Sequence, residues 1–169
     1  MKVVIADKLP ADTVARLTEL GLEVDYSPGL TADVLPDAVS DANVIVVRST
    51  QVTTEAINAA ADLMLIIRAG AGTNTIDCVR AAERAVFVAN CPGKNAIAVA
   101  ELTLGLMLSL DRRIPDNVAD LRAGRWAKKT YSKSDGVFGK TYGVIGTGTI
   151  GQEVIKRARA FGMSCHAWS

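Results

Sequence analysis

Short apolar runs rich in β-branched residues alternate along the first ninety residues with stretches in which apolar positions recur every three or four residues. The first pattern predicts buried strands and the second predicts amphipathic helices. The predicted strands cover residues 3–6, 22–26, 44–48, 63–68 and 86–90, and the predicted helices between them cover residues 11–20, 32–40, 54–61 and 76–84. Because parallel neighbours need crossover connections, this order is typical of an α/β fold with a parallel sheet covered on both faces.

Residues suited to helix starts support these bounds. Pro10 falls near the first turn of the first helix, and Thr31 and Thr53 stand where N-caps are expected. Asp77 is expected in the first turn of its helix, where a carboxylate is favoured. Pro36 either falls early in the second helix or kinks it.

Three of the predicted strands end in polar or glycine-rich turns. Arg48 is followed by Ser49, Arg68 by a turn that contains Gly70 and Gly72, and the last strand by residues 91–95. In open α/β sheets the carboxyl ends of the strands border the ligand crevice. The Arg48 guanidinium there suits a carboxylate or phosphate, and the glycines let backbone N–H groups approach an anion. Alternatively, both arginines extend into solvent and the glycines only turn the chain.

A composition shift after residue 95 predicts a domain boundary. A long apolar helix is expected over residues 96–112, a second helix over 116–123, and a polar connector from Gly124 onward. The long helix has too much apolar surface for an exposed connector, so we expect it to pack between domains or between subunits. Glu101 is interpreted as a carboxylate favoured by the helix dipole rather than as a catalytic group. The predicted domains are residues 1–98 and 99–169.

The last part of the chain carries a glycine motif between a strand and a helix. Strands are predicted over residues 140–145 and 163–168, with GTGTIG at 146–151 and a helix over 152–161 between them. In this context GxGxxG is the dinucleotide fingerprint: Gly146 permits the tight turn, Gly148 lets a pyrophosphate approach the backbone, and Gly151 allows close packing. Ser169 stands where an acidic residue would bind the ribose of NAD, which leaves both NAD and NADP open.

Composition excludes several classes of protein. With 49% apolar and 22% charged residues the chain is not disordered, and a net charge of +1 indicates neither nucleic-acid binding nor attraction to an anionic membrane. Three dispersed cysteines and one histidine do not make a zinc site, and the odd thiol count suits a reducing compartment. The early Asp7 argues against a signal peptide, and the apolar stretch 98–110 is too short to span a membrane. We therefore expect a cytoplasmic protein without metal.

Taken together, several stretches resemble the D-isomer-specific 2-hydroxyacid dehydrogenases, most closely the phosphoglycerate dehydrogenase branch. They are RSTQVTTEAINAA, IIRAGAGTNTID, VANCPGKNAIAVAELTLGLMLSLDRRIPDNVADLRAGRWAKK and GKTYGVIGTGTIGQEV, which lie between residues 44 and 169. The resemblance implies a flavodoxin-like substrate domain, hinges near residues 96–99 and 136–141, and a Rossmann domain inserted into the substrate domain. The present chain would then hold a linking helix and the first βαβ unit of an incomplete Rossmann domain.

The resemblance also implies roles for individual residues. Arg48, Ser49, Gly70 and Asn95 would contact the carboxylate or phosphate of a 2-hydroxy acid. Ala71 would lie near the nicotinamide, and Thr149 with Ile150 would meet the pyrophosphate and ribose. The chain departs from the usual family pattern at Asn74 and Thr75 (Asp-Asn), Ala85 (Gly), Thr149 (Arg) and Ser169 (often Asp), and these departures bear on the affinity for the cofactor and the choice between NAD and NADP.

The function implied by the resemblance is the oxidation of 3-phosphoglycerate to 3-phosphohydroxypyruvate in serine biosynthesis, by a homodimer or higher homo-oligomer. The family takes its catalytic Arg, Glu and His from the later half of the cofactor domain, so no catalytic residue is expected among these 169. His166 lies in a predicted strand, on the same face as Trp168, and is interpreted as structural. Two alternatives are an NADPH-dependent glyoxylate or hydroxypyruvate reductase, and a truncated, non-catalytic ligand-binding or dimerisation module.

Overall fold

The computed structural model describes residues 1–169, and the chain forms two compact units, Met1–Lys94 and Asn95–Ser169. The predicted division after residue 98 falls inside the helix α5 (Ala96–Arg112), which belongs wholly to the second unit. The assignment of substrate binding to one unit and cofactor binding to the other stays a prediction.

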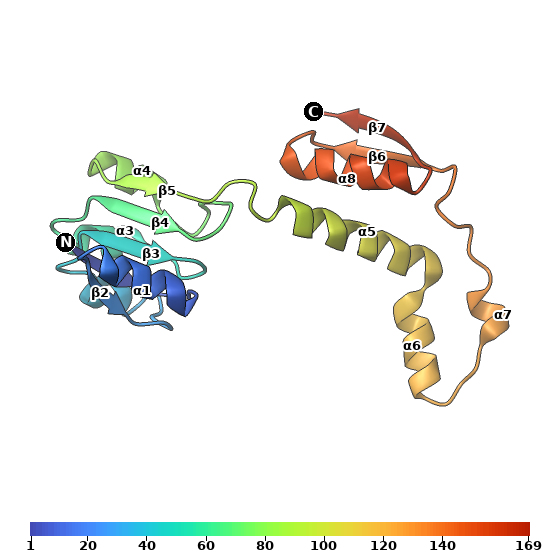
Figure 1. Cartoon of the computed structure of the whole chain (residues 1–169), viewed down its shortest axis with the longest axis horizontal. Coiled ribbons are helices and arrows are strands. Elements are labelled where there is room, and N and C mark those ends of the chain that lie inside the picture. The colour runs from blue at the N-terminus through green and yellow to red at the C-terminus, as the bar shows by residue number, and fades with distance from the viewer. The chain divides into compact units, whose positions relative to one another are not determined.

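The first unit contains a parallel sheet in which the strand order is β2-β1-β3-β4-β5 (Figure 1). This order is that of flavodoxin-like folds, which confirms the predicted fold class. The strands are β1 (Lys2–Ile5), β2 (Glu23–Tyr26), β3 (Val44–Val47), β4 (Leu65–Arg68) and β5 (Phe87–Ala89). Each of the strands predicted from the pattern is present, and its ends lie within two residues of the prediction.

Helices cover the two faces of this sheet unequally. Helix α1 (Ala11–Glu19) packs on one face, against Val3, Ile5, Val44 and Val46. Helices α2 (Leu35–Ala38), α3 (Thr54–Ala59) and α4 (Cys78–Glu83) pack on the other, against Val4, Ile45 and Val47. Successive side chains of a strand point to opposite faces, and both faces of this sheet are covered. Every residue of the central strand β3 is therefore buried. The core therefore extends up to Val47.

The helix starts agree only partly with the prediction. Thr53 is the N-cap of α3 and its hydroxyl accepts the Ala56 N–H, as expected. Asp77 is the N-cap of α4 rather than a residue of its first turn, and its carboxylate accepts the Arg80 N–H at 3.0 Å. Thr31 does not cap α2, which begins only at Leu35, because Pro36 fits no later than the first turn of a helix.

The second unit contains a two-stranded parallel sheet joined by a helix. Strands β6 (Thr141–Ile145) and β7 (Ser164–Trp168) pair along their whole length, and α8 (Thr149–Ala160) forms the crossover between them (Figure 1). Helix α5 packs against α8 through Ala100, Leu104 and Val154. The βαβ unit predicted around the glycine motif is therefore present.

Two helix bounds in this unit correct the prediction. Helix α8 begins at Thr149, directly after Gly148, and not at Gln152, so that the glycine motif runs into the first turn of the helix. Helix α6 (Ile114–Arg122) begins before Pro115, because proline is accepted in a first turn; Arg113, at φ 51°, makes the corner between α5 and α6. The connector that follows contains a short helix, α7 (Lys128–Tyr131).

Helix α5 buries only one of its apolar faces within the second unit. Leu104 is buried against α8, whereas Leu102, Leu106 and Leu110 are exposed. These exposed leucines recur every four residues and therefore form one stripe along the helix. No helix of the chain combines the length and the apolar character that crossing a membrane would require.

Candidate functional site

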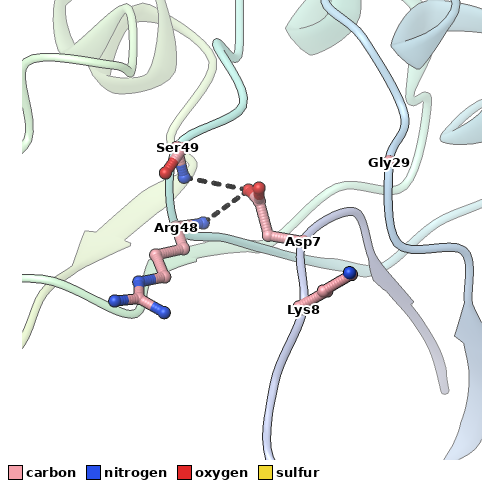
Figure 2. Close-up of a pocket in the computed structure, with 5 residues that line it drawn as sticks. All are labelled: Asp7, Lys8, Gly29, Arg48 and Ser49. Atoms are coloured by element: carbon pink, nitrogen blue, oxygen red, sulfur yellow. Dashed lines mark hydrogen bonds between the residues drawn. The ribbon is translucent and has the colours of Figure 1, made fainter.

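A pocket of about 380 Å³ opens at the carboxyl edge of the first sheet. It is lined by Asp7 and Lys8, which follow β1, by Gly29 after β2, and by Arg48 and Ser49 after β3 (Figure 2). These residues meet because β2, β1 and β3 are parallel neighbours, so that their carboxyl ends share one edge. The pocket is thus built from three segments that are distant in sequence.

Asp7 holds the turn after β3 through a single oxygen atom. Its Oδ2 accepts the backbone N–H groups of Arg48 at 2.7 Å, Ser49 at 3.0 Å and Thr50 at 2.9 Å. Partial burial raises the pKa of the Asp7 carboxyl, but the bonds from these three N–H groups outweigh burial and leave the pKa below its ordinary value. Asp7 is therefore an ionised anchor for the turn.

Of the three candidate substrate residues in the first unit, Arg48 and Ser49 are exposed at the pocket, and Gly70 does not line it. The neighbouring Arg68 does not extend into solvent: its Nε donates to the Arg48 carbonyl oxygen at 3.2 Å. Its guanidinium lies over the glycine turn, so that a Cβ added at Gly72 would come within 2.9 Å of Arg68 Nη1. A side chain at position 72 would therefore displace the Arg68 guanidinium from its place over the turn.

Gly70 and Ala71 form the turn that follows β4, next to the Arg48 turn. The Gly70 N–H donates to the Arg68 carbonyl within the turn, at 2.8 Å, so it is already engaged and does not point freely at a ligand. The Gly70 carbonyl accepts the Cys91 N–H, and the Ala71 carbonyl accepts the Asn90 side-chain amide at 2.7 Å. These bonds tie the turns after β4 and β5 together.

Asn95 and the glycine motif belong to the second unit. The other candidate residues belong to the first unit; they are Arg48, Ser49, Gly70 and Ala71. Asn95 is the N-cap residue of α5, but its side chain accepts no bond from the helix and is exposed. The side-chain amide is therefore free of a local structural role. Joint action of Asn95 with Arg48 stays a prediction.

The glycine motif of the second unit has the backbone geometry that its spacing predicts. Gly146 adopts φ +93°, a conformation that favours glycine, and its N–H donates to the Trp168 carbonyl at 2.7 Å. A Cβ added at Gly151 would collide with the Gly146 carbonyl oxygen. Around Gly148, by contrast, there is open space and an ordinary φ of −65°. Gly146 and Gly151 are thus required by the fold itself, and Gly148 is not.

This turn fits the pyrophosphate of a dinucleotide. Gly148 is the N-cap of the twelve-residue helix α8 and offers no side chain to its first-turn N–H groups, which carry the positive end of the helix dipole. Thr149 and Ile150 begin the helix and are exposed. Ser169 directly follows Trp168, whose carbonyl binds Gly146, so the end of β7 lies beside the turn. The candidate cofactor residues of the second unit are therefore assembled at this turn, whereas Ala71 belongs to the first unit.

Other candidate polar residues have local partners or lie apart. Glu101 forms an ion pair with Arg157 of α8 at 3.3 Å. His166 is exposed on β7, where it pairs in register with Gly143. No group of three or more histidine, cysteine or acidic side chains is close enough together to hold a metal ion.

Three pocket residues, Asp7, Lys8 and Gly29, were not predicted as site residues from the sequence. The sequence prediction used Asp7 only as an early charge and placed candidate ligand-binding residues in the turns after β3, β4 and β5, not in the turn after β1. The signal was available, because Asp7 and Lys8 follow a buried strand of the same parallel sheet. The same rule that selected Arg48 selects these two residues as well.

Comparisons with known proteins agree with the fold and with the glycine motif. The family profile described as "D-isomer specific 2-hydroxyacid dehydrogenase, catalytic domain" matches residues 3–165. The D-3-phosphoglycerate dehydrogenase of Methanocaldococcus jannaschii is 46% identical over 165 residues, which are 97% of this chain and 31% of that protein. The hydroxypyruvate reductase of Thermotoga maritima is 46% identical over 143 residues, which are 84% of this chain and 46% of that protein.

Among solved structures, the NAD-bound 3-phosphoglycerate dehydrogenase of Entamoeba histolytica superposes with a TM-score of 0.79 and 27% identity, covering all of this chain and 54% of the other. The chain spans about a third of the length of the phosphoglycerate dehydrogenase from M. jannaschii. The match of the family profile extends across both units and includes the Arg48 turn and the glycine motif. The chain therefore belongs to the D-isomer-specific 2-hydroxyacid dehydrogenase family.

Proposed function

We propose that this chain supplies the substrate-binding unit and the beginning of the cofactor unit of a dehydrogenase that oxidises 3-phosphoglycerate to 3-phosphohydroxypyruvate. The observation that carries the proposal is the cationic pocket at the carboxyl edge of the first sheet. Lys8 and Arg48 line it, and Arg68 lies next to it. Asp7, the acidic residue of the pocket lining, binds backbone N–H groups instead of these cations.

A phosphorylated hydroxy acid carries two anionic groups, and the pocket can bind at least one of them. The Arg48 guanidinium can form two parallel hydrogen bonds to a carboxylate or phosphate, and Lys8 can add a point charge. The Ser49 hydroxyl supplies a further donor at the same turn. These groups would bind and orient the substrate, while the acid and base of the reaction are not assigned to any residue of this chain.

The second unit is proposed to bind NAD through the turn of Gly146, Gly148 and Gly151. The free N–H groups at the start of α8 would hold the pyrophosphate, and Thr149 and Ile150 would lie beside it. A nicotinamide bound there would supply the acceptor for the hydride of the carbon that carries the hydroxyl group. Ser169 does not repel a 2′-phosphate, so NADP would also fit at this residue. We propose NAD because the homologous E. histolytica enzyme binds it.

We also propose a role in serine biosynthesis, a cytoplasmic location and a homodimer or higher homo-oligomer. The cytoplasmic location is supported by three free cysteines, two of which are exposed. The homo-oligomer is supported by the exposed leucine stripe of α5, Leu102, Leu106 and Leu110.

A binding experiment on the purified chain tests the substrate. We expect 3-phosphoglycerate to shift the backbone amide NMR signals around Arg48, and Arg48→Ala to weaken binding about tenfold or more, because a charged hydrogen bond contributes about 1.5–3 kcal/mol. The matched control is Arg16→Ala, an exposed arginine of α1 outside the pocket lining. Equal affinity of the wild type and Arg48→Ala would contradict the assignment of the pocket.

A second candidate is a hydroxypyruvate reductase, because the T. maritima relative with that name is also 46% identical. The two candidates differ in whether the substrate carries a phosphate. If 3-phosphoglycerate binds more tightly than D-glycerate and the difference disappears in Arg48→Ala, the phosphoglycerate proposal is supported. If D-glycerate and hydroxypyruvate bind as well as the phosphorylated acid, the reductase is favoured.

A further inference from the structure

We infer that Asp7 is a positioning residue, which holds the Arg48–Ser49–Thr50 turn so that the Arg48 and Ser49 side chains face the pocket. This inference rests on the proposed function of that pocket. Figure 2 shows the Asp7 carboxylate beside the backbone nitrogens of Arg48 and Ser49, while the Arg48 side chain leads away from it. Asp7 thus acts on the backbone of the turn and not on the guanidinium.

The geometry of the turn depends on Asp7 because three successive N–H groups converge on one atom. The distances to Asp7 Oδ2 are 2.7, 3.0 and 2.9 Å for Arg48, Ser49 and Thr50. Successive N–H groups can point at one acceptor only when the chain curls around it, and such a concave turn is a backbone nest for an anion. Without Asp7, nothing else accepts these three donors, and the turn directly after Val47 would lose its anchor.

The same contacts also determine how a ligand can bind. A backbone nest attracts any anion, including a substrate phosphate, but here the Asp7 carboxylate already fills it. The ion pairs of the chain involve other residues, so Asp7 forms no direct ion pair with Lys8 or Arg48. The side chains of Arg48, Ser49 and Lys8 therefore remain to bind a ligand, whereas the three N–H groups of the turn are occupied.

Substitutions that separate charge from geometry test this inference. Asp7→Asn keeps an oxygen at the same distance from the backbone and removes the charge. Asp7→Glu keeps the charge and moves the carboxylate by one methylene group. We expect Asp7→Asn to bind 3-phosphoglycerate within about threefold of the wild type, and Asp7→Glu and Asp7→Ala to bind it about tenfold more weakly, the equivalent of one charged hydrogen bond.

A matched control is Asp41→Ala. Asp41 forms an exposed ion pair with Lys2, at the amino ends of the same strands, so its loss should leave ligand affinity unchanged. Circular dichroism of each variant shows whether it is folded. If Asp7→Ala does not fold, Asp7→Glu carries the comparison.

Hydrogen exchange makes the test independent of the substrate. The amides of Arg48, Ser49 and Thr50 should exchange slowly in the wild type and Asp7→Asn, and rapidly in Asp7→Glu and Asp7→Ala. Unchanged exchange in the last two variants, or unchanged or tighter 3-phosphoglycerate binding by them, would overturn the inference. If the wild type does not bind 3-phosphoglycerate at all, the proposed substrate is wrong, and the exchange rates still decide whether Asp7 holds the turn.

Discussion

Gly151 lies so close to Gly146 that a Cβ on Gly151 would collide with the Gly146 carbonyl oxygen. This contact joins the first turn of α8 to the end of β6, and it places the helix start directly above the strand. Gly148, between them, has no neighbour within 4 Å of an added Cβ. The two glycines therefore have different reasons for lacking a side chain. Gly151 lacks one because of chain packing, and at Gly148 the open space leaves room for a ligand to approach.

Substitution of these glycines should separate stability from cofactor binding. We expect Gly151→Ala to lower the free energy of unfolding by about 1–3 kcal/mol, because the backbone must shift to make room. Gly148→Ala should change it by less than about 0.5 kcal/mol but weaken the binding of NAD, since the methyl group occupies the space of the pyrophosphate. Urea unfolding and NAD titration measure the two effects. Equal destabilisation by both substitutions would show that the motif serves packing alone.

Ala85 should be a site of stabilisation. It follows Arg84, the C-cap of α4, with φ +53°, the left-handed conformation, and it stands where the family usually has glycine. This conformation costs alanine about 1–2 kcal/mol, part of which is offset because glycine is more flexible in the unfolded chain. Ala85→Gly is therefore expected to raise the free energy of unfolding by about 0.5–1 kcal/mol in urea.

The control for Ala85 is Gly21→Ala. Gly21 has φ +78° and open space around an added Cβ, so the substitution introduces only the conformational cost. It should lower the free energy of unfolding by about 1 kcal/mol. If Ala85→Gly also lowers it, another contact of the Ala85 methyl group outweighs the relief of the backbone.

Asp7 should make the stability of the first unit sensitive to acid. In the folded chain the pKa of the Asp7 carboxyl lies below the ordinary value of 3.8. Partial burial raises this pKa, but the hydrogen bonds from backbone N–H groups lower it by more. The resulting stabilisation is present above the unfolded pKa and is lost as the pH falls through the lower folded pKa. The free energy of unfolding should therefore fall less steeply between about pH 5 and pH 3 in Asp7→Asn than in the wild type.

The comparison with Asp7→Asn isolates this carboxyl from others that act in the same direction. Hydrogen bonds lower the pKa values of Asp77 and Asp120 as well, through Thr54 and Tyr131 respectively, and both remain in the variant. If the free energy of unfolding changes with pH in the same way in the variant and the wild type, the pKa of Asp7 does not differ between the folded and unfolded chain.

Strands were predicted more closely than helix ends, and there is a physical reason. The strands of the parallel sheet are covered on both faces, so each is an uninterrupted apolar run such as Val44–Val47. Helix ends depend on single residues, and the predicted helix start was wrong at two prolines. Pro36 and Pro115 each stand in a first turn, so the helix expected before Pro36 starts late and the helix expected after Pro115 starts early.

The candidate site was predictable where residue type and chain position coincide, as at Arg48 and Gly146. It was not predictable where a residue acts through backbone groups distant in sequence. Nothing in the neighbourhood of Asp7 indicates that it accepts N–H groups of residues more than forty positions away. Likewise, the contact of Arg68 with the Arg48 carbonyl depends on the pairing of β3 with β4.

The core ends and the pocket begins within one peptide bond, between the fully buried Val47 and the exposed Arg48. A change of side chain at Arg48 or Ser49 therefore removes no apolar contact from the sheet. Such an arrangement lets the ligand specificity of the pocket change in evolution while the fold is kept. It also offers a practical route to redesign, in which residues on the pocket side of this bond are varied while β3 is kept constant.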